Sequence, residues 1–152
     1  MPTFDVMAIS FLGATSHGSS PALPGAVRVT PMRSILLVDD DAEIRLALRD
    51  FLTAERFVVH TARDGQHALH VLEKIDPPNL ILLDYKMPIM DGKQFLSVLR
   101  RMPRLQTIPV VILSAATREW SGAHLEVEEV LSKPVDLEVL RTAVNRIFAE
   151  RL

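Results

Sequence analysis

Short apolar runs alternate along the chain with segments whose apolar residues recur every three or four positions. The runs are strand candidates and cover residues 35–38, 57–61, 80–83, 108–113 and 129–132. Helical spacing predicts helices over roughly residues 42–54, after Asp64-Gly65, from Asp91 to Pro103 and after Asp136. This alternation with short connections predicts an α/β fold of right-handed βαβ units, with a parallel sheet covered on both faces.

Reactive or charged side chains stand at the carboxyl ends of four of these strands. Asp39 and Asp40 follow the first strand, Asp84 the third, Ser114 the fourth and Lys133 the fifth. The carboxyl ends of parallel strands meet at one edge of the sheet, and ligands bind there. We therefore expect three carboxylates, a hydroxyl and a lysine to share one shallow pocket.

This set of side chains suits Mg²⁺ and phosphoryl chemistry. Mg²⁺ prefers oxygen ligands, and a carboxylate can attack phosphorus while a cation and a lysine neutralise the phosphoryl oxygens. No glycine-rich phosphate loop is visible, so a nucleotide substrate is not expected. The competing interpretation is an inert scaffold whose carboxylates cap helices. Capping explains Asp41 but neither Asp84 nor Lys133.

Composition narrows the classes of function. The 152 residues are 48% apolar and carry a net charge of −2, which gives no basic surface for direct DNA binding. The absence of cysteine excludes disulfides, thiolate catalysis and cysteine-ligated zinc. No apolar run is long enough to span a membrane, and no lysine or arginine precedes Arg28, as a signal peptide would require. We expect a cytoplasmic protein.

The first 32 residues differ from the rest. They contain four of the ten prolines and the run Gly18-Ser19-Ser20, and no helix or strand period is sustained there. We interpret residues 1–32 as a disordered or non-native tail, with Met32 as a possible true start. Residues 33–152 form one domain, and the chain ends directly after the last predicted helix, so no output module is expected.

Five motifs in order make the chain resemble a response-regulator receiver domain of bacterial two-component signalling, of the single-domain type. They are Leu37-Val38-Asp39-Asp40, the run from Leu83 to Gly92, Leu113-Ser114-Ala115 and Lys133-Pro134, together with Asp64-Gly65 before Ala68-Leu69. The resemblance covers about residues 33–152. It implies a flavodoxin-like doubly wound (βα)5 fold whose five-stranded parallel sheet has the order 2-1-3-4-5.

The resemblance also implies a role for each residue. Asp84 would accept a phosphoryl group from a sensor histidine kinase or a histidine phosphotransfer protein. Mg²⁺ would be held by Asp39, Asp40, Asp84 and the backbone carbonyl of Lys86. Ser114 would bond a phosphoryl oxygen, and Lys133 would pair with the phosphoryl group. The resemblance also implies a cis peptide bond between Lys133 and Pro134. Phosphorylation would switch a surface that binds a downstream protein target, and the chain would catalyse only its own phosphorylation and dephosphorylation.

Two features depart from the family pattern. Val130 occupies the position, three residues before the lysine, where an aromatic switch is usual. The segment from Ser114 to Lys133 is about three residues short, which predicts a shortened fourth helix. Signalling through an aromatic flip is therefore not expected. Lys86, two residues past Asp84, is predicted to alter the rate of dephosphorylation.

Other interpretations remain open at this point. A Mg²⁺-dependent phosphatase or phosphotransferase also phosphorylates a strand-end aspartate, but it needs a second carboxylate where this chain has Lys86. A degenerate receiver would bind partners without phosphorylation, and the intact acidic set disfavours it. His67 and His70 have a metal-site spacing but no third ligand nearby, so surface histidines are favoured. Arg100, Arg101 and Arg104 are interpreted as a solvated helix end.

Overall fold

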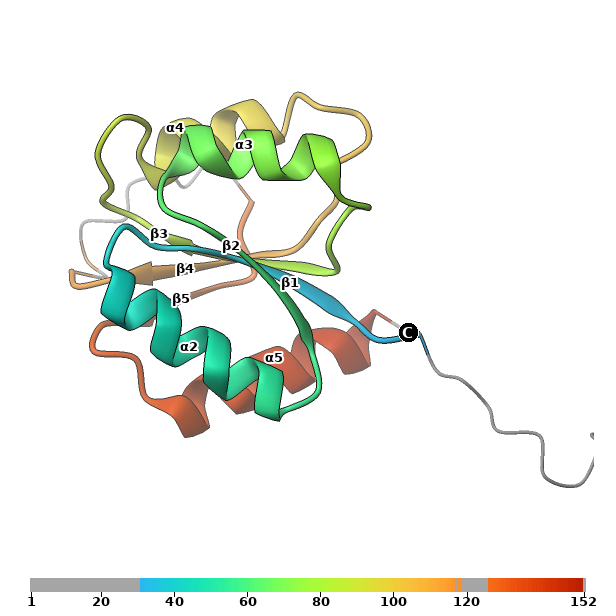
Figure 1. The fold of residues 1–152 in the computed structure, drawn as a ribbon, viewed down its shortest axis with the longest axis vertical. Coiled ribbons are helices and arrows are strands. Elements are labelled where there is room, and N and C mark those ends of the chain that lie inside the picture. The colour runs from blue at the N-terminus through green and yellow to red at the C-terminus, as the bar shows by residue number, and fades with distance from the viewer. Residues whose placement is uncertain (1–30, 117, 119–125, 152) are drawn as a thin grey trace, which may run out of the picture. The chain divides into compact units, whose positions relative to one another are not determined.

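The computed structural model describes residues 31–116, 118 and 126–151 (Figure 1). The strands in this part of the chain are β1 (Ser34–Val38), β2 (Val58–Ala62), β3 (Leu80–Asp84), β4 (Val110–Ser114) and β5 (Glu129–Ser132). The helices are α2 (Ala42–Ala54), α3 (Gly65–Lys74), α4 (Gly92–Leu99) and α5 (Leu137–Glu150).

The five strands form one parallel sheet in the order β2-β1-β3-β4-β5. Helices α2 and α5 cover one face of the sheet, and α3 and α4 cover the other (Figure 1). This arrangement confirms the predicted flavodoxin-like fold and its strand order. The order reverses between β1 and β3, so the carboxyl ends of these central strands lie at the switch point of the sheet.

The core lies in two layers that alternate strand residues fill. In β1, Ile35 and Leu37 face the layer with α2 and α5, whereas Leu36 and Val38 face the layer with α3 and α4. Every residue of β3 and β4 is buried. Burial on both faces explains why these strands appear in the sequence as continuous apolar runs rather than as alternating patterns.

The second strand begins one residue later than the sequence predicts, because the Phe57 N–H forms a hydrogen bond that ends α2. The Phe57 N–H donates to the Leu52 carbonyl at 3.1 Å, and the Arg56 N–H donates to the Thr53 carbonyl at 3.0 Å. Arg56 has a left-handed φ of 72°. These are the two bonds and the backbone conformation of a Schellman motif, so pairing of β2 with β1 starts at Val58.

Helix α4 is shorter than predicted. It ends at Leu99, and the Arg101 and Met102 N–H groups then donate to carbonyls only three residues back. A residue before a proline disfavours helical geometry, and Pro103 follows Met102 directly. The apolar Met102 therefore packs against the core from a turn rather than from the helix.

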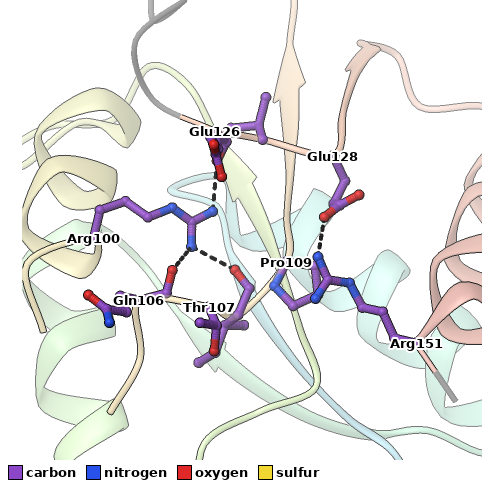
Figure 2. A pocket seen from close by; sticks show the side chains of 9 residues that line it. Arg100, Gln106, Thr107, Pro109, Glu126, Glu128 and Arg151 are labelled. Atoms are coloured by element: carbon purple, nitrogen blue, oxygen red, sulfur yellow. Dashed lines mark hydrogen bonds and ion pairs between the residues drawn. The ribbon is translucent and has the colours of Figure 1, made fainter. Parts of the chain in front are cut away.

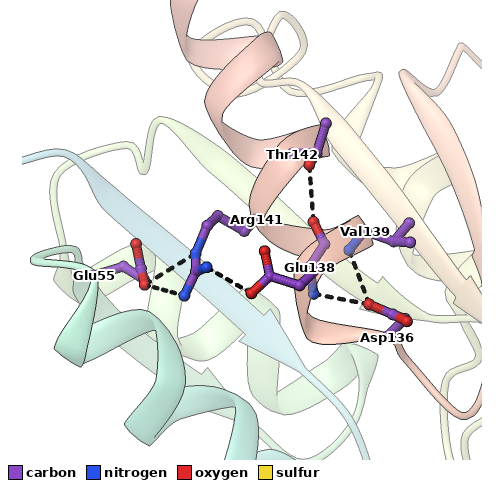
Figure 3. Close-up of polar contacts among 6 residues, drawn as sticks. All are labelled: Glu55, Asp136, Glu138, Val139, Arg141 and Thr142. Atoms are coloured by element: carbon purple, nitrogen blue, oxygen red, sulfur yellow. Dashed lines mark hydrogen bonds and ion pairs between the residues drawn. The ribbon is translucent and has the colours of Figure 1, made fainter.

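An arginine joins the end of α2 to the start of α5 (Figure 3). The guanidinium of Arg141 donates to a carboxylate oxygen of Glu55 at 2.7 Å and to Glu138 at 2.6 Å. It also lies over the Phe51 ring, 5.2 Å from the ring centroid. Asp136 caps α5 by accepting the N–H groups of Glu138 and Val139, as the sequence predicts. These contacts fix the start of α5, which follows the loop that carries Lys133.

Some sequence interpretations lie outside the described residues. The tail interpretation concerns residues 1–32, of which residues 1–30 are not described. The short helix predicted between Ser114 and Lys133, which is not α4, falls on residues 117 and 119–125, and these are not described either. The Lys133–Pro134 bond is cis, as the resemblance implies. Within residues 31–116, 118 and 126–151, every helix is too short or too polar to cross a membrane.

Candidate functional site

The predicted site residues converge at the carboxyl edge of the sheet. Asp84 is the last residue of β3 and is paired with Leu113 of β4. Asp39 follows β1 directly, and Ser114 ends β4. The Lys133 N–H donates to the Ser114 carbonyl at 2.8 Å, which holds the end of β5 beside β4. Parallel pairing alone therefore places these side chains together.

Three carboxylates form a compact cluster at this edge. One oxygen each from Asp39, Asp40 and Asp84 lies within 4.8 Å of the others. Asp39 is fully buried and Asp84 is 5% exposed, whereas Asp40 is exposed to solvent. Hard oxygen donors that can be reached from water on one side fit a cation such as Mg²⁺, which keeps part of its water shell.

Lys133 bridges the two buried carboxylates. Its Nζ lies 2.7 Å from Oδ2 of Asp39 and 3.3 Å from Oδ1 of Asp84. Burial lowers the pKa of Lys133, but the hydrogen bond and negative charge of Asp39, aided by Asp84, outweigh burial and raise the pKa overall. Lys133 therefore stays cationic at neutral pH.

Asp84 has a perturbed carboxyl group. Burial, the negative charge of Asp39 and a side-chain hydrogen bond with Asp40 raise the pKa of Asp84 to about 7, although Lys133 opposes the change. A carboxyl group whose pKa is shifted toward neutrality beside an open cavity is typical of functional sites. A cation in the cluster would favour the ionised form, because opposite charge stabilises a carboxylate.

Asp39 is held rigidly by its neighbours. Its Oδ1 accepts the Asp41 N–H at 2.9 Å, and its backbone carbonyl accepts an Arg45 guanidinium N–H at 2.7 Å. The Asp39 N–H donates to the Ala62 carbonyl of β2 at 3.1 Å. Asp41 also caps α2, as predicted. The sequence does not predict the support from Arg45, because a side chain that reaches back six residues to a backbone carbonyl leaves no pattern in the sequence.

A cavity of about 280 Å³ opens over Asp84. Asp40, Asp84, Lys86, Ser114 and Lys133 all line it, whereas the fully buried Asp39 lies beneath. The Ser114 hydroxyl oxygen accepts the Ala116 N–H at 3.2 Å, so it is tied to the start of the following loop. The structure thus brings every predicted site residue to one edge of the sheet, where all of them except Asp39 line one small opening.

The histidines and arginines singled out in the sequence lie elsewhere. Nδ1 of His67 accepts the Arg63 N–H at 3.1 Å, and Nδ1 of His70 is 4.0 Å from Glu73. His67 thus has a local structural partner in the turn that begins α3. In the described part of the chain, the only metal-capable group of three or more His, Cys, Asp or Glu side chains is the carboxylate cluster.

The interpretation of the arginines as a solvated helix end is wrong for Arg100, which is half-buried, whereas Arg104 is exposed as that interpretation predicts. Arg100 donates to the Gln106 and Ile108 carbonyls at 2.8 Å and to the Glu126 carbonyl at 2.7 Å. Figure 2 shows the bonds from Arg100 to Gln106 and Glu126. Burial lowers the pKa of Arg100. Arg104 donates to the Leu72 carbonyl at 2.8 Å and so binds the end of α3. The sequence pattern does not reveal backbone carbonyls as partners.

Known proteins are similar to this chain in sequence and in fold. The family model described as "Response regulator receiver domain" matches residues 35–145. The probable chemotaxis protein CheY of Rhizobium etli is 32% identical over 118 residues, which are 75% of this chain and 91% of that protein. The transcriptional regulatory protein CpxR of Escherichia coli is 39% identical over 120 residues, which are 77% of this chain and 50% of CpxR. The structure of CheY4 of Vibrio cholerae aligns with a TM-score of 0.71 and 28% identity, covering 76% of this chain and 98% of CheY4.

Proposed function

This chain belongs to the response-regulator receiver domains of two-component signalling, and from that membership we propose that Asp84 accepts a phosphoryl group from a phosphohistidine donor in a Mg²⁺-dependent reaction. The observation that carries the proposal is the cluster at the sheet edge. Asp84 lines an open cavity, Lys133 lies 3.3 Å from its carboxylate, and Asp39 and Asp40 complete the oxygen set.

The reaction follows from the chemistry of these groups. A carboxylate oxygen of Asp84 attacks phosphorus, the phosphorus–nitrogen bond of the donor breaks, and the imidazole leaves with the electron pair and takes up a proton. Lys133 offsets the negative charge that gathers on the phosphoryl oxygens. The Ser114 hydroxyl donates its O–H to one of these oxygens and can still accept the Ala116 N–H. Dephosphorylation is the attack of water on the same phosphorus, with Asp84 as the leaving group.

The metal ion fits the donor set described above. Asp39, Asp40, Asp84 and the backbone carbonyl of Lys86 would hold Mg²⁺, which when bound supplies positive charge to the phosphoryl oxygens. Asp39 is the residue best fixed for this purpose, because the Asp41 N–H and Lys133 orient its carboxylate.

The proposed reaction implies a phosphoryl donor, a downstream target and a cellular location. The donor is a sensor histidine kinase or a histidine phosphotransfer protein, and the output is a changed surface that binds a downstream protein without direct DNA contact. These reaction partners place the chain in the cytoplasm. In this proposal the receiver domain is residues 33–152.

Intact mass spectrometry after treatment with acetyl phosphate and Mg²⁺ tests the proposal. Wild-type protein is expected to gain one phosphoryl group, and no gain is expected in EDTA or in Asp84→Asn. Glu73→Gln, an exposed carboxylate variant on α3, serves as the matched control and should be phosphorylated normally. Absence of the gain in wild type would favour a receiver that binds partners without phosphorylation. Steady turnover of a small phosphate ester would favour a phosphatase.

A further inference from the structure

The loop between Asp84 and α4 has a strained backbone. The Met90 N–H donates to the Pro88 carbonyl at 2.7 Å and closes a three-residue turn around Ile89. Ile89 has a left-handed φ of 69°, although it is β-branched, and its side chain is 74% exposed. Such a residue rarely adopts this conformation by its own preference. The surroundings of the loop must therefore hold it in place.

One support closes the base of the loop. The Gly92 N–H donates to the Tyr85 carbonyl at 2.9 Å. A Cβ at Gly92 would lie 2.6 Å from the backbone oxygen of Asp84, so only glycine allows the chain to pass this close. The two ends of the loop are thus fixed directly beside Asp84.

A second support comes from a different part of the sequence. Gly65, the first residue of α3, donates its N–H to the Met90 carbonyl at 3.1 Å. A Cβ at Gly65 would lie 2.7 Å from Cγ and 2.8 Å from the backbone oxygen of Met90. The backbone of Gly65 is not left-handed. The close contact with Met90, rather than a special conformation, therefore explains the glycine.

A glycine in a helix also needs a structural explanation. Alanine is favoured over glycine inside a helix, so a glycine at a position that alanine could adopt costs stability unless it has a local purpose. The buried side chain of Asp64 caps α3 through the His67 N–H at 2.7 Å, which fixes the position of Gly65 relative to β2. The start of α3 is therefore a rigid surface against which Met90 rests.

We propose that Gly65 is a positioning residue for the phosphorylation site. By holding Met90, it fixes the loop that carries Lys86, and with it the backbone carbonyl assigned to Mg²⁺ above. The effect on the loop follows from the geometry alone, whereas the effect on Mg²⁺ rests on the proposed function. Gly65 does not line the cavity over Asp84.

Gly65→Ala tests the proposal, with Gln66→Ala as the matched control, because Gln66 is the next residue of α3 and is exposed. In EDTA, hydrogen exchange of the peptide covering residues 85–92 is expected to accelerate in Gly65→Ala and to stay unchanged in Gln66→Ala. By titration calorimetry, Mg²⁺ affinity should fall by roughly tenfold or more in Gly65→Ala, as for other residues that orient metal ligands. Met90→Ala, which adds no atoms, should change both measurements in the same direction.

A variant destabilised far from the site separates positioning from general loss of stability. Ile147→Ala removes a fully buried side chain near the end of α5, and it should lower stability while leaving loop exchange and Mg²⁺ affinity unchanged. Wild-type exchange of residues 85–92 in both Gly65→Ala and Met90→Ala would overturn the proposal. If wild type itself binds no Mg²⁺, the proposed function fails, and the exchange data still decide the role of Gly65.

Discussion

Lys133 makes its closest ion pair with Asp39, at 2.7 Å, rather than with Asp84, at 3.3 Å. The Asp39 side chain is fully buried, and the Lys133 side chain is 16% exposed. Two carboxylates and an ammonium group thus share a space that water reaches from one side only. Because isolated buried charges are costly, the lysine stabilises the metal-free fold in addition to its proposed role in phosphoryl transfer.

Removal of this lysine should destabilise the metal-free protein. Lys133→Met leaves the buried carboxylates without their cation, and we expect the free energy of unfolding to fall by about 3 kcal/mol. Urea denaturation in EDTA measures the loss. Mg²⁺ should restore part of it, because a cation in the cluster compensates the same charges. Lys74→Met, on the exposed surface of α3, is the control, and an equal loss in both variants would contradict this explanation.

The carboxyl group of Asp84 should reduce stability at high pH. Its pKa is raised to about 7 from an ordinary value of 3.8, so the folded protein binds this proton more tightly than the unfolded chain does. The cost of ionising Asp84 is fully present above pH 7, shrinks as the pH falls through 7, and is absent below about pH 4.

Asp84→Asn removes that cost at every pH. In EDTA at pH 8 the variant is expected to be more stable than wild type by about 2 kcal/mol, with the difference fading toward pH 4. Chemical denaturation at several pH values provides the measurement. Mg²⁺ should reverse the order at pH 8 by binding wild type more tightly. A stability difference that is independent of pH would show that Asp84 is not the titrating group.

Lys86 should protect the aspartyl phosphate from water. Its side chain lines the cavity beside Asp84 and Ser114, where a hydrolytic water would approach phosphorus. We expect Lys86→Ala to shorten the half-life of phosphorylated protein, followed by intact mass after removal of acetyl phosphate. Lys93→Ala, a lysine of α4, should decay like wild type. An unchanged half-life in Lys86→Ala would remove this role.

Arg100 should stabilise the fold without affecting the site. Its guanidinium group donates to two carbonyls on the segment after α4 and to one on the segment before β5. Lysine keeps the charge but lacks this geometry, so Arg100→Lys is expected to cost roughly 2 kcal/mol of unfolding free energy. Phosphorylation by acetyl phosphate should proceed normally, because these contacts lie at the opposite, amino-terminal edge of β4 and β5. A phosphorylation defect that persists under fully folded conditions would show that the two edges are coupled.

The sequence predicted the parts of the fold that local chemistry controls. Strands β1, β3 and β4 are buried on both faces, so their apolar runs are unmistakable, and a polar residue, Asp39, Asp84 or Ser114, stands at the end of each run. Asp41, Asp91 and Asp136 cap helices through N–H groups within three residues, and the sequence shows such caps directly. Because parallel strands align their ends, these local features also predicted which side chains meet at the site.

Tertiary contacts decided the rest. Three contacts join residues that are distant in sequence. They are the ion pair between Lys133 and Asp39, the bond from Arg100 to the Glu126 carbonyl, and the contact between Gly65 and Met90. The partner is in two cases a backbone carbonyl, which every residue possesses, so no pattern of side chains reveals it. The raised pKa of Asp84 likewise depends first on burial, which exists only once the layers have packed. The sequence thus determined which groups reach the site, and packing determined how they are held and charged there.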